Sequence, residues 1–220
     1  LCTMLLGDLG ADVIKIEPPQ GDPARGYGPP FVAGESPYFL SVNRNKRSIV
    51  IDLKHPEGAK LARDLAARAD VLVTNFRPSA MQRLGLDEPS LRALNPRLIY
   101  CQVTGYGPRG PWADVPAFDQ VAQGMSGLMS VTGKPESGPV RVGIAIADIL
   151  AALFATYGVL AALYERERSG VGQRVDTSLL GAVIGVLTFQ AGRYLADGSE
   201  PGLEGNDHPV AAPYGTFRCA

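Results

Sequence analysis

Histidine and cysteine are scarce in this sequence. It contains 2 histidines, His55 and His208, and 3 widely spaced cysteines, Cys2, Cys101 and Cys219, without a Cys-x-x-Cys spacing. This composition disfavours a histidine-rich metal centre, a zinc site, a disulfide framework and a Ser-His-Asp triad. We therefore expect no metal site, a reducing cytoplasmic location, and chemistry that depends on carboxylates.

An excess of charge of either sign is also missing. The 21 Lys and Arg residues nearly cancel the 22 Asp and Glu residues, so the chain has no basic footprint for nucleic acid and no polybasic membrane anchor. The motifs GxGxxG after the first strand and GxxxxGK[ST] are absent as well. We expect small-molecule ligands, held by side chains and loop backbone rather than by either glycine motif.

One hydrophobic run, residues 142–163, has about the length of a membrane-spanning helix. It contains the charge of Asp148, and charges of both signs follow it at residues 165–168. A membrane span would instead have a flank enriched in positive charge on one side. The run is therefore interpreted as a buried core helix that begins near Asp148, and no membrane partner is expected.

Short β-branched runs alternate with segments of helical periodicity. The runs are residues 12–16, 48–51, 71–74 and 98–104. Residues 56–69, between two of them, have a helical apolar pattern that begins with proline. This alternation is typical of βαβ units and predicts an α/β fold with a Rossmann-like, mostly parallel sheet. Ligands are then expected at the loops where strands end.

Glycine and proline indicate the domain organisation. We assign residues 1–196 to a Rossmann-like large domain, with a last apolar helix over residues 178–196. Residues 197–220, rich in Gly and Pro, are assigned to a linker towards a second domain that the chain lacks. Because residues 1–9 already have an apolar helical pattern without a start methionine, we expect a fragment that is truncated at both ends.

Five strings, in order along the chain, carry a resemblance to one enzyme family. They are LLGDLGADVIKIEPPQGDP, NRNKRSIVIDLKHPEG, NFRPSAMQRLG, LIYCQVTGYG and SGPVRVGIAIADILAALFATYGVLAALYERERSGVGQRVD. Together they resemble the family III CoA transferases (CaiB/BaiF), typified by formyl-CoA and carnitine CoA transferases. The resemblance implies a CoA-binding large domain, a smaller second domain, and an interlocked homodimer in the full-length protein.

The family's nucleophilic aspartate is matched by Asp148. A carboxylate in the first turn of an apolar helix is favoured as the anion, and apolar neighbours strip it of water, which suits a nucleophile. The implied reaction moves CoA from an acyl-CoA thioester to a free carboxylic acid through an aspartyl-acyl anhydride and an aspartyl-CoA thioester, without a permanently bound cofactor. From position alone, the favoured alternative is that Asp148 only caps the helix.

Further residues match positions that line the CoA site in the family. They are Asn75, Phe76, Arg83, Lys54 and Ile51. Arg83 offers a planar fork for phosphate oxygens, and Phe76 offers an apolar wall. The alternative for Arg83 and Lys54 is an ordinary solvated surface position.

Pro18 stands where many members of the family carry an arginine that meets the CoA nucleotide. Three nearby cations, Arg25, Arg44 and Lys46, could replace this charge. Each of the three is more often a surface residue without such a role.

Phe118 and Asp119 occupy the segment where the racemase branch of the family has a His-Asp pair. A racemase needs two opposed proton-transfer groups, and phenylalanine cannot be one of them. This favours CoA transfer over the alternative of 2-methylacyl-CoA racemisation, and Asp119 is either a carboxylate that lines the substrate pocket or a helix cap.

A third possibility is an inactive CoA-binding fragment. Candidate acids include oxalate, succinate, carnitine-like and aromatic acids.

Overall fold

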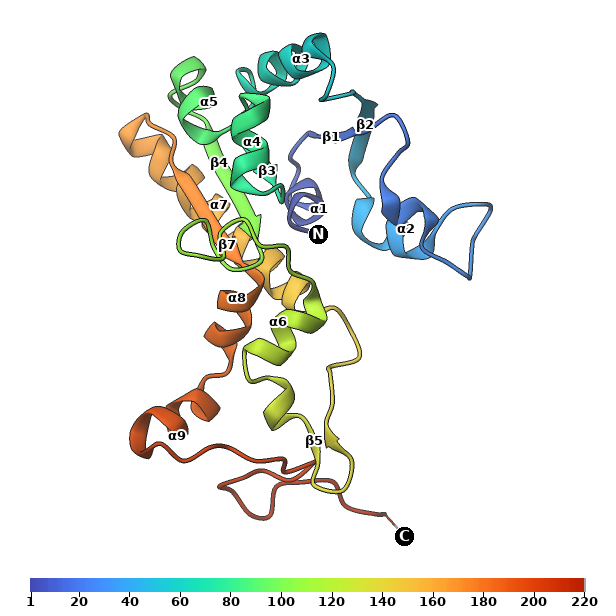
Figure 1. Cartoon of the computed structure of the whole chain (residues 1–220), viewed down its shortest axis with the longest axis vertical. Coiled ribbons are helices and arrows are strands. Elements are labelled where there is room, and N and C mark those ends of the chain that lie inside the picture. Colours follow the sequence, from blue (N-terminus) through green and yellow to red (C-terminus); the bar gives the residue numbers. More distant parts are fainter. Residues whose placement is uncertain (220) are drawn as a thin grey trace.

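Parallel strands form the centre of the computed structural model, which describes residues 1–219 (Figure 1). These strands are β1 (Val13–Glu17), β2 (Lys46–Val50), β3 (Val71–Thr74), β4 (Ile99–Thr104) and β7 (Arg174–Ser178). A short antiparallel pair, β5 (Gly133–Lys134) and β6 (Gly138–Pro139), lies apart from them. The α/β class and the parallel direction are thereby confirmed, since every pairing among the five central strands is parallel.

The helices connect and cover these strands. They are α1 (Cys2–Asp8), α2 (Pro37–Asn43), α3 (Pro56–Ala66), α4 (Pro78–Leu84), α5 (Glu88–Leu94), α6 (Asp119–Met125), α7 (Ile146–Ser169), α8 (Leu179–Val186) and α9 (Phe189–Asp197), with 3₁₀ turns η1 (Pro23–Gly26) and η2 (Met129–Val131). Proline lies in the first turn of each of α2 to α5. There it costs no hydrogen bond, because the first N–H groups of a helix have no partner within the helix.

Hydrogen bonding divides the central strands into two groups. β1 pairs with β2, and a second ladder has the order β3-β4-β7. The predicted parallel arrangement holds within both ladders, and the division into two ladders within residues 1–219 is a detail that the sequence had not indicated. The register of the larger ladder places Val73 and Val175 on either side of Cys101.

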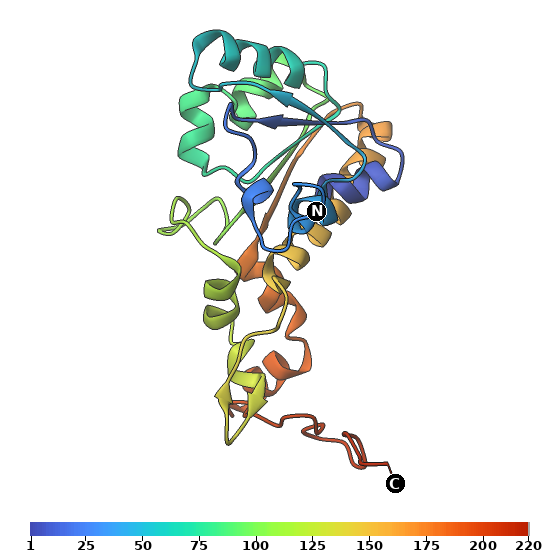
Figure 2. The same ribbon diagram turned by 90° about the vertical axis from the view of Figure 1, so that its right-hand side faces the viewer.

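Strand β4 is buried on both faces, and its side chains alternate between two hydrophobic clusters. Ile99 and Cys101 pack with α1 and α7. Tyr100, together with Leu98 just before the strand, packs with α3, α4 and α5. Figure 2 shows these two sets of helices on opposite sides of the strands. The result is a layered helix–strand–helix arrangement, as expected for parallel strands that are covered on both faces.

Helix α7 is long and apolar enough to cross a membrane by length and composition. Here it packs along β4 and β7 and also contacts α1, α6 and α8. Its buried stripe includes Ala151, Ala155 and Val159. The opposite face exposes large side chains such as Tyr157 and Tyr164. The predicted core helix is therefore confirmed on one face only.

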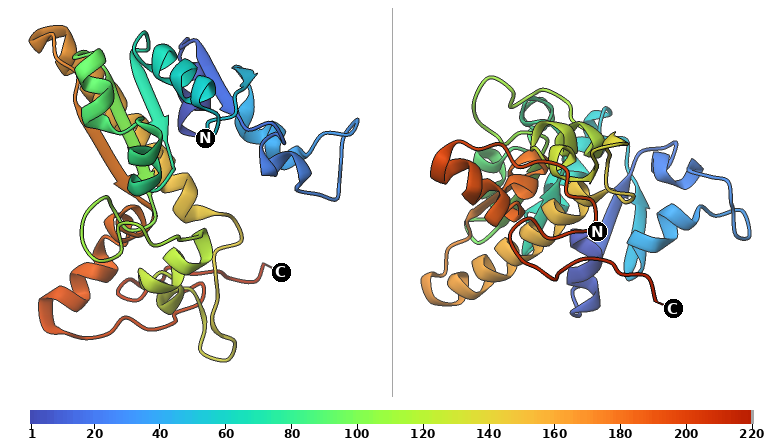
Figure 3. Two further views of the ribbon diagram at one scale, coloured as in Figure 1. Left: turned by 45° about the horizontal axis from the view of Figure 1, so that its top comes forward. Right: turned by 90° about the horizontal axis from the view of Figure 1, so that it is seen from below.

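The single helix predicted over residues 178–196 is wrong, because the chain breaks between α8 and α9, which are bent by 81°. Thr188 at the break has φ 44°. Through Leu179, Ala182 and Val183, α8 packs against α6 and α7, whereas no residue of α9 is buried. Figure 3 shows α6, α8 and α9 below the layered part, with the C-terminal segment beside them.

Candidate functional site

The carboxyl ends of β3, β4 and β7 meet at one edge of the larger ladder, because the three strands are parallel. Helix α7 precedes β7 in the chain and packs on β4 and β7. A crossover helix of this kind runs back along the sheet, so its N-terminus starts at the carboxyl edge of the strands. Asp148, in the first turn of α7, therefore shares this edge with the loops that follow Thr74 and Thr104, where ligands gather in such folds.

Asp148 does not cap its own helix. The N-cap residue of α7 is Ala145, which makes no side-chain cap bond. The N–H of Ala147 instead donates to Oδ1 of Asp119 at 2.8 Å. The interpretation of Asp148 as a cap is therefore wrong, and the interpretation of Asp119 as a helix cap is correct, although it caps α7 from the first turn of α6.

The Asp148 carboxylate is exposed and accepts no hydrogen bond from residues 1–219. Partial desolvation raises the pKa of Asp148 above its ordinary value, and the negative charge of Asp119 raises it further. Both effects disfavour the anion, so the ionised carboxylate is poorly stabilised and more reactive as a nucleophile.

Gln123, which is fully buried, connects this site to the segment before α7. Its Nε2 donates to Oδ2 of Asp119 at 2.7 Å and to the carbonyl of Ile144 at 3.4 Å. Its Oε1 accepts the N–H of Val142 at 2.8 Å. Only an amide offers donors and an acceptor in this arrangement. Gln123 was not among the residues predicted from the sequence, although its position four residues after Asp119 on one helix was a signal.

Two aromatic side chains differ in their relation to the carboxylates. Phe118, the N-cap residue of α6, is 76% exposed, so the structure brings Asp119 but not Phe118 into the network described above. Tyr38, on α2, lies near these carboxylates. Desolvation raises the pKa of its phenol, and the negative charges of Asp148 and Asp119 raise it further. No sequence pattern had indicated Tyr38.

Hydrogen bonds between backbone groups and side chains fix the loop that contains Asn75 and Phe76. The N–H of Phe76 donates to Oγ1 of Thr74 at 3.1 Å, and the carbonyl of Phe76 accepts from Nε2 of Gln102 at 3.0 Å. Gln102 is buried and also accepts a hydrogen bond from Arg174 at 2.7 Å. The side chains of Asn75 and Phe76 are left exposed at the carboxyl end of β3, where they can contact a ligand.

Lys54 and Arg83 line the same open cavity of about 520 Å³. Ile51 is buried and lines a neighbouring cavity of about 300 Å³ with His55 and Leu61. The structure thus brings together two of the predicted CoA-binding residues from different elements, and it separates Ile51 from that pair.

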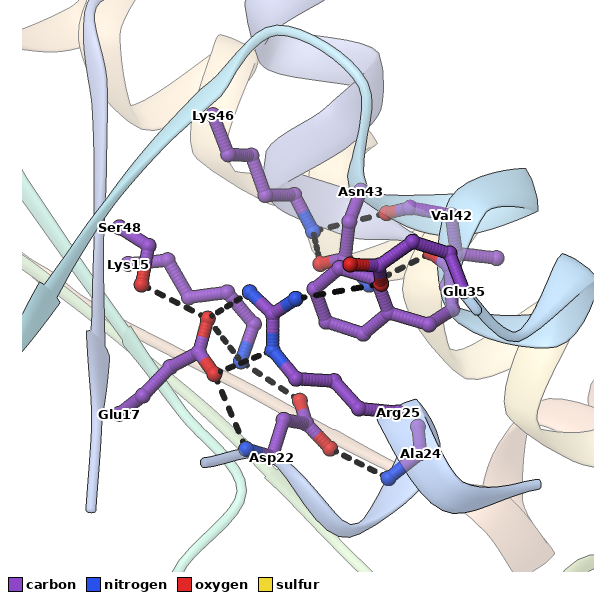
Figure 4. A network of polar contacts seen from close by, with 11 residues as sticks. Lys15, Glu17, Asp22, Ala24, Arg25, Glu35, Val42, Asn43, Lys46 and Ser48 are labelled. Atoms are coloured by element: carbon purple, nitrogen blue, oxygen red, sulfur yellow. Dashed lines mark hydrogen bonds and ion pairs between the residues drawn. The ribbon is translucent and has the colours of Figure 1, made fainter. Parts of the chain in front are cut away.

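The three cations considered as replacements for an arginine at Pro18 all have partners within the protein. Arg25 forms two hydrogen bonds of 2.9 Å with the Glu17 carboxylate (Figure 4). Its guanidinium also lies 3.9 Å from the centre of the Phe39 ring. Arg44 forms a bidentate ion pair with Asp8.

Lys46, the third cation, donates hydrogen bonds of 2.8 Å to the carbonyl of Val42 and to Oδ1 of Asn43 (Figure 4). Burial lowers the pKa of Lys46 to about 8. The expectation that Arg25, Arg44 or Lys46 supplies a free charge is therefore not supported by their contacts.

Glu17 is the buried centre of the network in Figure 4, with 2% of its surface exposed. Arg25 is the main reason that the pKa of Glu17 is lowered to about 2, and hydrogen bonds from Ser48 and from the N–H of Asp22 add to the effect. A depressed carboxyl pKa stabilises the fold above the unfolded value, 4.5, and this stabilisation is lost as the pH falls towards 2.

Replacing Glu17 by glutamine is expected to lower the free energy of unfolding at pH 7 by about 2 kcal/mol, because Arg25 loses a charged partner. Denaturant unfolding of the two proteins between pH 7 and pH 2.5 measures this, and the difference should shrink below pH 4.5. Glu35→Gln is the matched control, since Glu35 is an exposed partner of Arg25 at 3.5 Å. Equal stability of the Glu17→Gln and Glu35→Gln proteins would contradict the prediction.

Cys2 and Cys101 are free thiols buried in the core, and Cys219 is free and exposed. Among residues 1–219, no group of three or more His, Cys, Asp or Glu side chains is arranged to hold a metal ion.

Comparison with known proteins identifies similar sequences and structures. The family model described as CoA-transferase family III matches residues 1–220. The chain is 48% identical over 217 residues to the succinate–glutarate CoA-transferase of Agrobacterium fabrum, covering 96% of this chain and 54% of the relative. It is 44% identical over 217 residues to the succinyl-CoA:glutarate CoA-transferase of Mus musculus, covering 98% and 50%.

A further relative is the acetyl-CoA:oxalate CoA-transferase of Acetobacter aceti, 43% identical over 218 residues, covering 98% of this chain and 56% of the relative. Among solved structures, a CAIB/BAIF family protein from Brucella suis matches with a TM-score of 0.93 and 45% identity, covering 99% of this chain and 58% of that one. The chain spans about half the length of the curated relatives it matches.

Proposed function

The chain belongs to CoA-transferase family III, and we propose that it forms the part of an acyl-CoA:carboxylate CoA-transferase that carries the nucleophile, Asp148. The observation that carries this proposal is that Asp148, in the first turn of α7, does not cap this helix. Asp119 instead accepts the hydrogen bond from the N–H of Ala147. Asp148 is therefore free to react without loss of the helix cap.

In the proposed reaction, an oxygen of Asp148 attacks the thioester carbonyl of the acyl-CoA donor, and the CoA thiolate leaves. The thiolate then attacks the Asp148 carbonyl of the resulting anhydride, which releases the donor acid and leaves an aspartyl-CoA thioester. The acceptor carboxylate then attacks the aspartyl-CoA thioester, which releases the CoA thiolate and forms a second anhydride. The thiolate attacks the acceptor carbonyl of this anhydride, so the products are the new acyl-CoA and free Asp148. Every nucleophile and leaving group is a carboxylate or a thiolate, so no step requires net proton transfer.

The electrostatics around Asp148 support this role. Desolvation and the Asp119 charge make the ionised carboxylate less stable than in water. Its conversion into a neutral anhydride or thioester removes that unfavourable charge. The raised pKa also predicts the pH dependence: only ionised Asp148 reacts, so transfer falls as the pH falls through a pKa above the ordinary value of 3.8.

We propose that CoA binds at the carboxyl edge of the strands, with Asn75 and Phe76 beside the ligand and with Lys54 and Arg83 at its phosphates. Ile51 then contributes through the apolar wall of the neighbouring cavity. No permanently bound cofactor is required, because CoA enters as the thioester substrate.

Short dicarboxylic acids are the proposed acids, because the names of the relatives mention succinate, glutarate and oxalate. We further propose that residues 197–220 lead to a second domain and that the full-length protein is a cytoplasmic homodimer. Incubation of the intact protein with succinyl-CoA and a panel of free acids, with new CoA esters detected by mass spectrometry, tests the activity. Deuterium incorporation at the α-carbon of a 2-methylacyl-CoA, without transfer, would favour racemisation instead.

Replacing Arg83 by alanine is expected to raise KM for the acyl-CoA by roughly ten-fold to a hundred-fold with a smaller change in kcat, because one charge-assisted phosphate contact is lost. Steady-state kinetics on the intact protein measure this. Arg83→Lys should restore only part of the affinity, since an ammonium group lacks the planar fork. A collapse of kcat at unchanged KM would assign Arg83 to the transition state and contradict the prediction.

A further inference from the structure

Three cations from three segments converge on the cavity of about 520 Å³. Arg63 comes from α3, Lys54 from the loop before α3, and Arg83 from the end of α4. The other side chains in its wall are neutral: Leu53, Pro56, Ala59, Gln82, Leu84 and Gly85. The wall therefore carries positive charge without a carboxylate to balance it.

None of the three cations forms an ion pair with a carboxylate of residues 1–219. Arg83 has only a small effect on Asp114. The pKa of Asp114 is lowered mainly by the hydrogen bond from the N–H of Ser79, with smaller effects from Arg77 and Arg83. The two other arginines considered for CoA binding are paired, Arg25 with Glu17 and Arg44 with Asp8. The cations at this cavity are therefore available to an external anion.

Arg63 is half-buried, and one of its nitrogens is fixed. Nη1 donates to the carbonyl of Leu84 at 3.2 Å. The approach is close because Gly85 has no side chain: a Cβ there would lie 3.3 Å from Nη1. This contact holds the guanidinium at the wall, while Nε and Nη2 form no hydrogen bond with residues 1–219 and remain available to a ligand.

We propose that Arg63 is a further binding residue for a phosphate group of CoA, acting with Lys54 and Arg83; this inference rests on the proposed function. A phosphate presents several acceptor oxygens and up to two negative charges, which matches convergent donors on a wall without acids. Arg63 thus provides the cationic contact that Arg25, Arg44 and Lys46, committed to other partners, do not. CoA carries both a 3′-phosphomonoester and a diphosphate bridge, and either can supply the oxygens.

Isothermal titration of the intact protein with CoA tests the inference, with Arg63→Gln as the variant and Lys60→Gln, an exposed residue of the same helix, as the control. Arg63→Gln should weaken binding about ten-fold, and Lys60→Gln by less than about two-fold. The same titration with 3′-dephospho-CoA identifies the phosphate. If Arg63 holds the monoester, the difference between wild type and Arg63→Gln disappears with this ligand, and if it holds the diphosphate, the difference persists.

The thermal unfolding midpoint separates binding from a purely structural role. If Arg63 serves only to hold Leu84, Arg63→Gln lowers the midpoint and leaves the affinity for CoA equal to that of the control, which overturns the inference. Arg63→Lys should bind with intermediate affinity, because one ammonium must serve both the Leu84 carbonyl and the phosphate. Failure of the wild-type protein to bind CoA at all would reject the proposed function itself, a result distinct from equal binding by wild type and Arg63→Gln.

Discussion

Replacing Asp148 by asparagine is expected to lower kcat for CoA transfer by roughly four orders of magnitude or more, because the amide cannot form the anhydride or the aspartyl thioester. The affinity for CoA should change little, since the proposed phosphate contacts lie elsewhere. Transfer from succinyl-CoA to glutarate by the intact protein measures the first effect, and titration with CoA measures the second.

Stability provides an internal control for Asp148→Asn. A carboxyl group with a raised pKa destabilises the folded protein at neutral pH, because the ionised form is better solvated after unfolding. The substitution should therefore leave the unfolding midpoint unchanged or higher. Asp12→Asn is the matched control for loss of a carboxylate, since Asp12 forms an exposed ion pair with Arg47 at the start of β1. Substantial transfer by the Asp148→Asn protein would contradict the proposed nucleophile.

Replacing Gln123 by glutamate is expected to lower kcat about a hundred-fold at pH 8, with a smaller loss at pH 5. The new carboxylate would face Oδ2 of Asp119, to which Gln123 now donates at 2.7 Å, and also the carbonyl of Ile144. Mutual repulsion would displace Asp119 from the N–H of Ala147 and disturb the first turn of α7. At lower pH, the two carboxyl groups can share one proton and restore the hydrogen bond, so the defect should diminish.

The pH profile distinguishes this effect from simple loss of packing. Gln120→Glu on the exposed face of the same helix is the control and should leave the profile unchanged. Gln123→Leu should lower activity by a similar factor at every pH, because it removes the hydrogen bonds without adding a charge. A Gln123→Glu defect that does not vary between pH 5 and pH 8 would contradict the proposed positioning of Asp119.

Local patterns predicted much of this fold. The β-branched runs coincide with β1 to β4, and every end agrees to within two residues. Pro56 begins α3, as the sequence pattern predicted. The position of Asp148 in the first turn of an apolar helix also followed from its neighbours. These features depend on residues that are close in sequence, so the sequence alone was sufficient to predict them.

Contacts between distant segments could not be predicted in the same way. The bond from Ala147 to Asp119 joins two helices across a loop, and only the packing of α6 on α7 brings these residues together. The cavity with Arg63 depends likewise on the close approach of α3 to Leu84. The break before α9 falls at Leu187 and Thr188, neither of which is glycine or proline. There α8, which packs against α6 and α7, is followed by α9, of which no residue is buried.

The most direct test of the central claim is chemical trapping of the enzyme intermediate. Intact protein is mixed with succinyl-CoA, quenched with hydroxylamine and digested with trypsin, and the peptides are fragmented in a mass spectrometer. The proposal predicts an acyl-CoA-dependent hydroxamate in the peptide of residues 142–166, located at Asp148 rather than at Glu165, the other acidic residue of that peptide. A hydroxamate on another residue, or continued CoA transfer without any modification of Asp148, would contradict it.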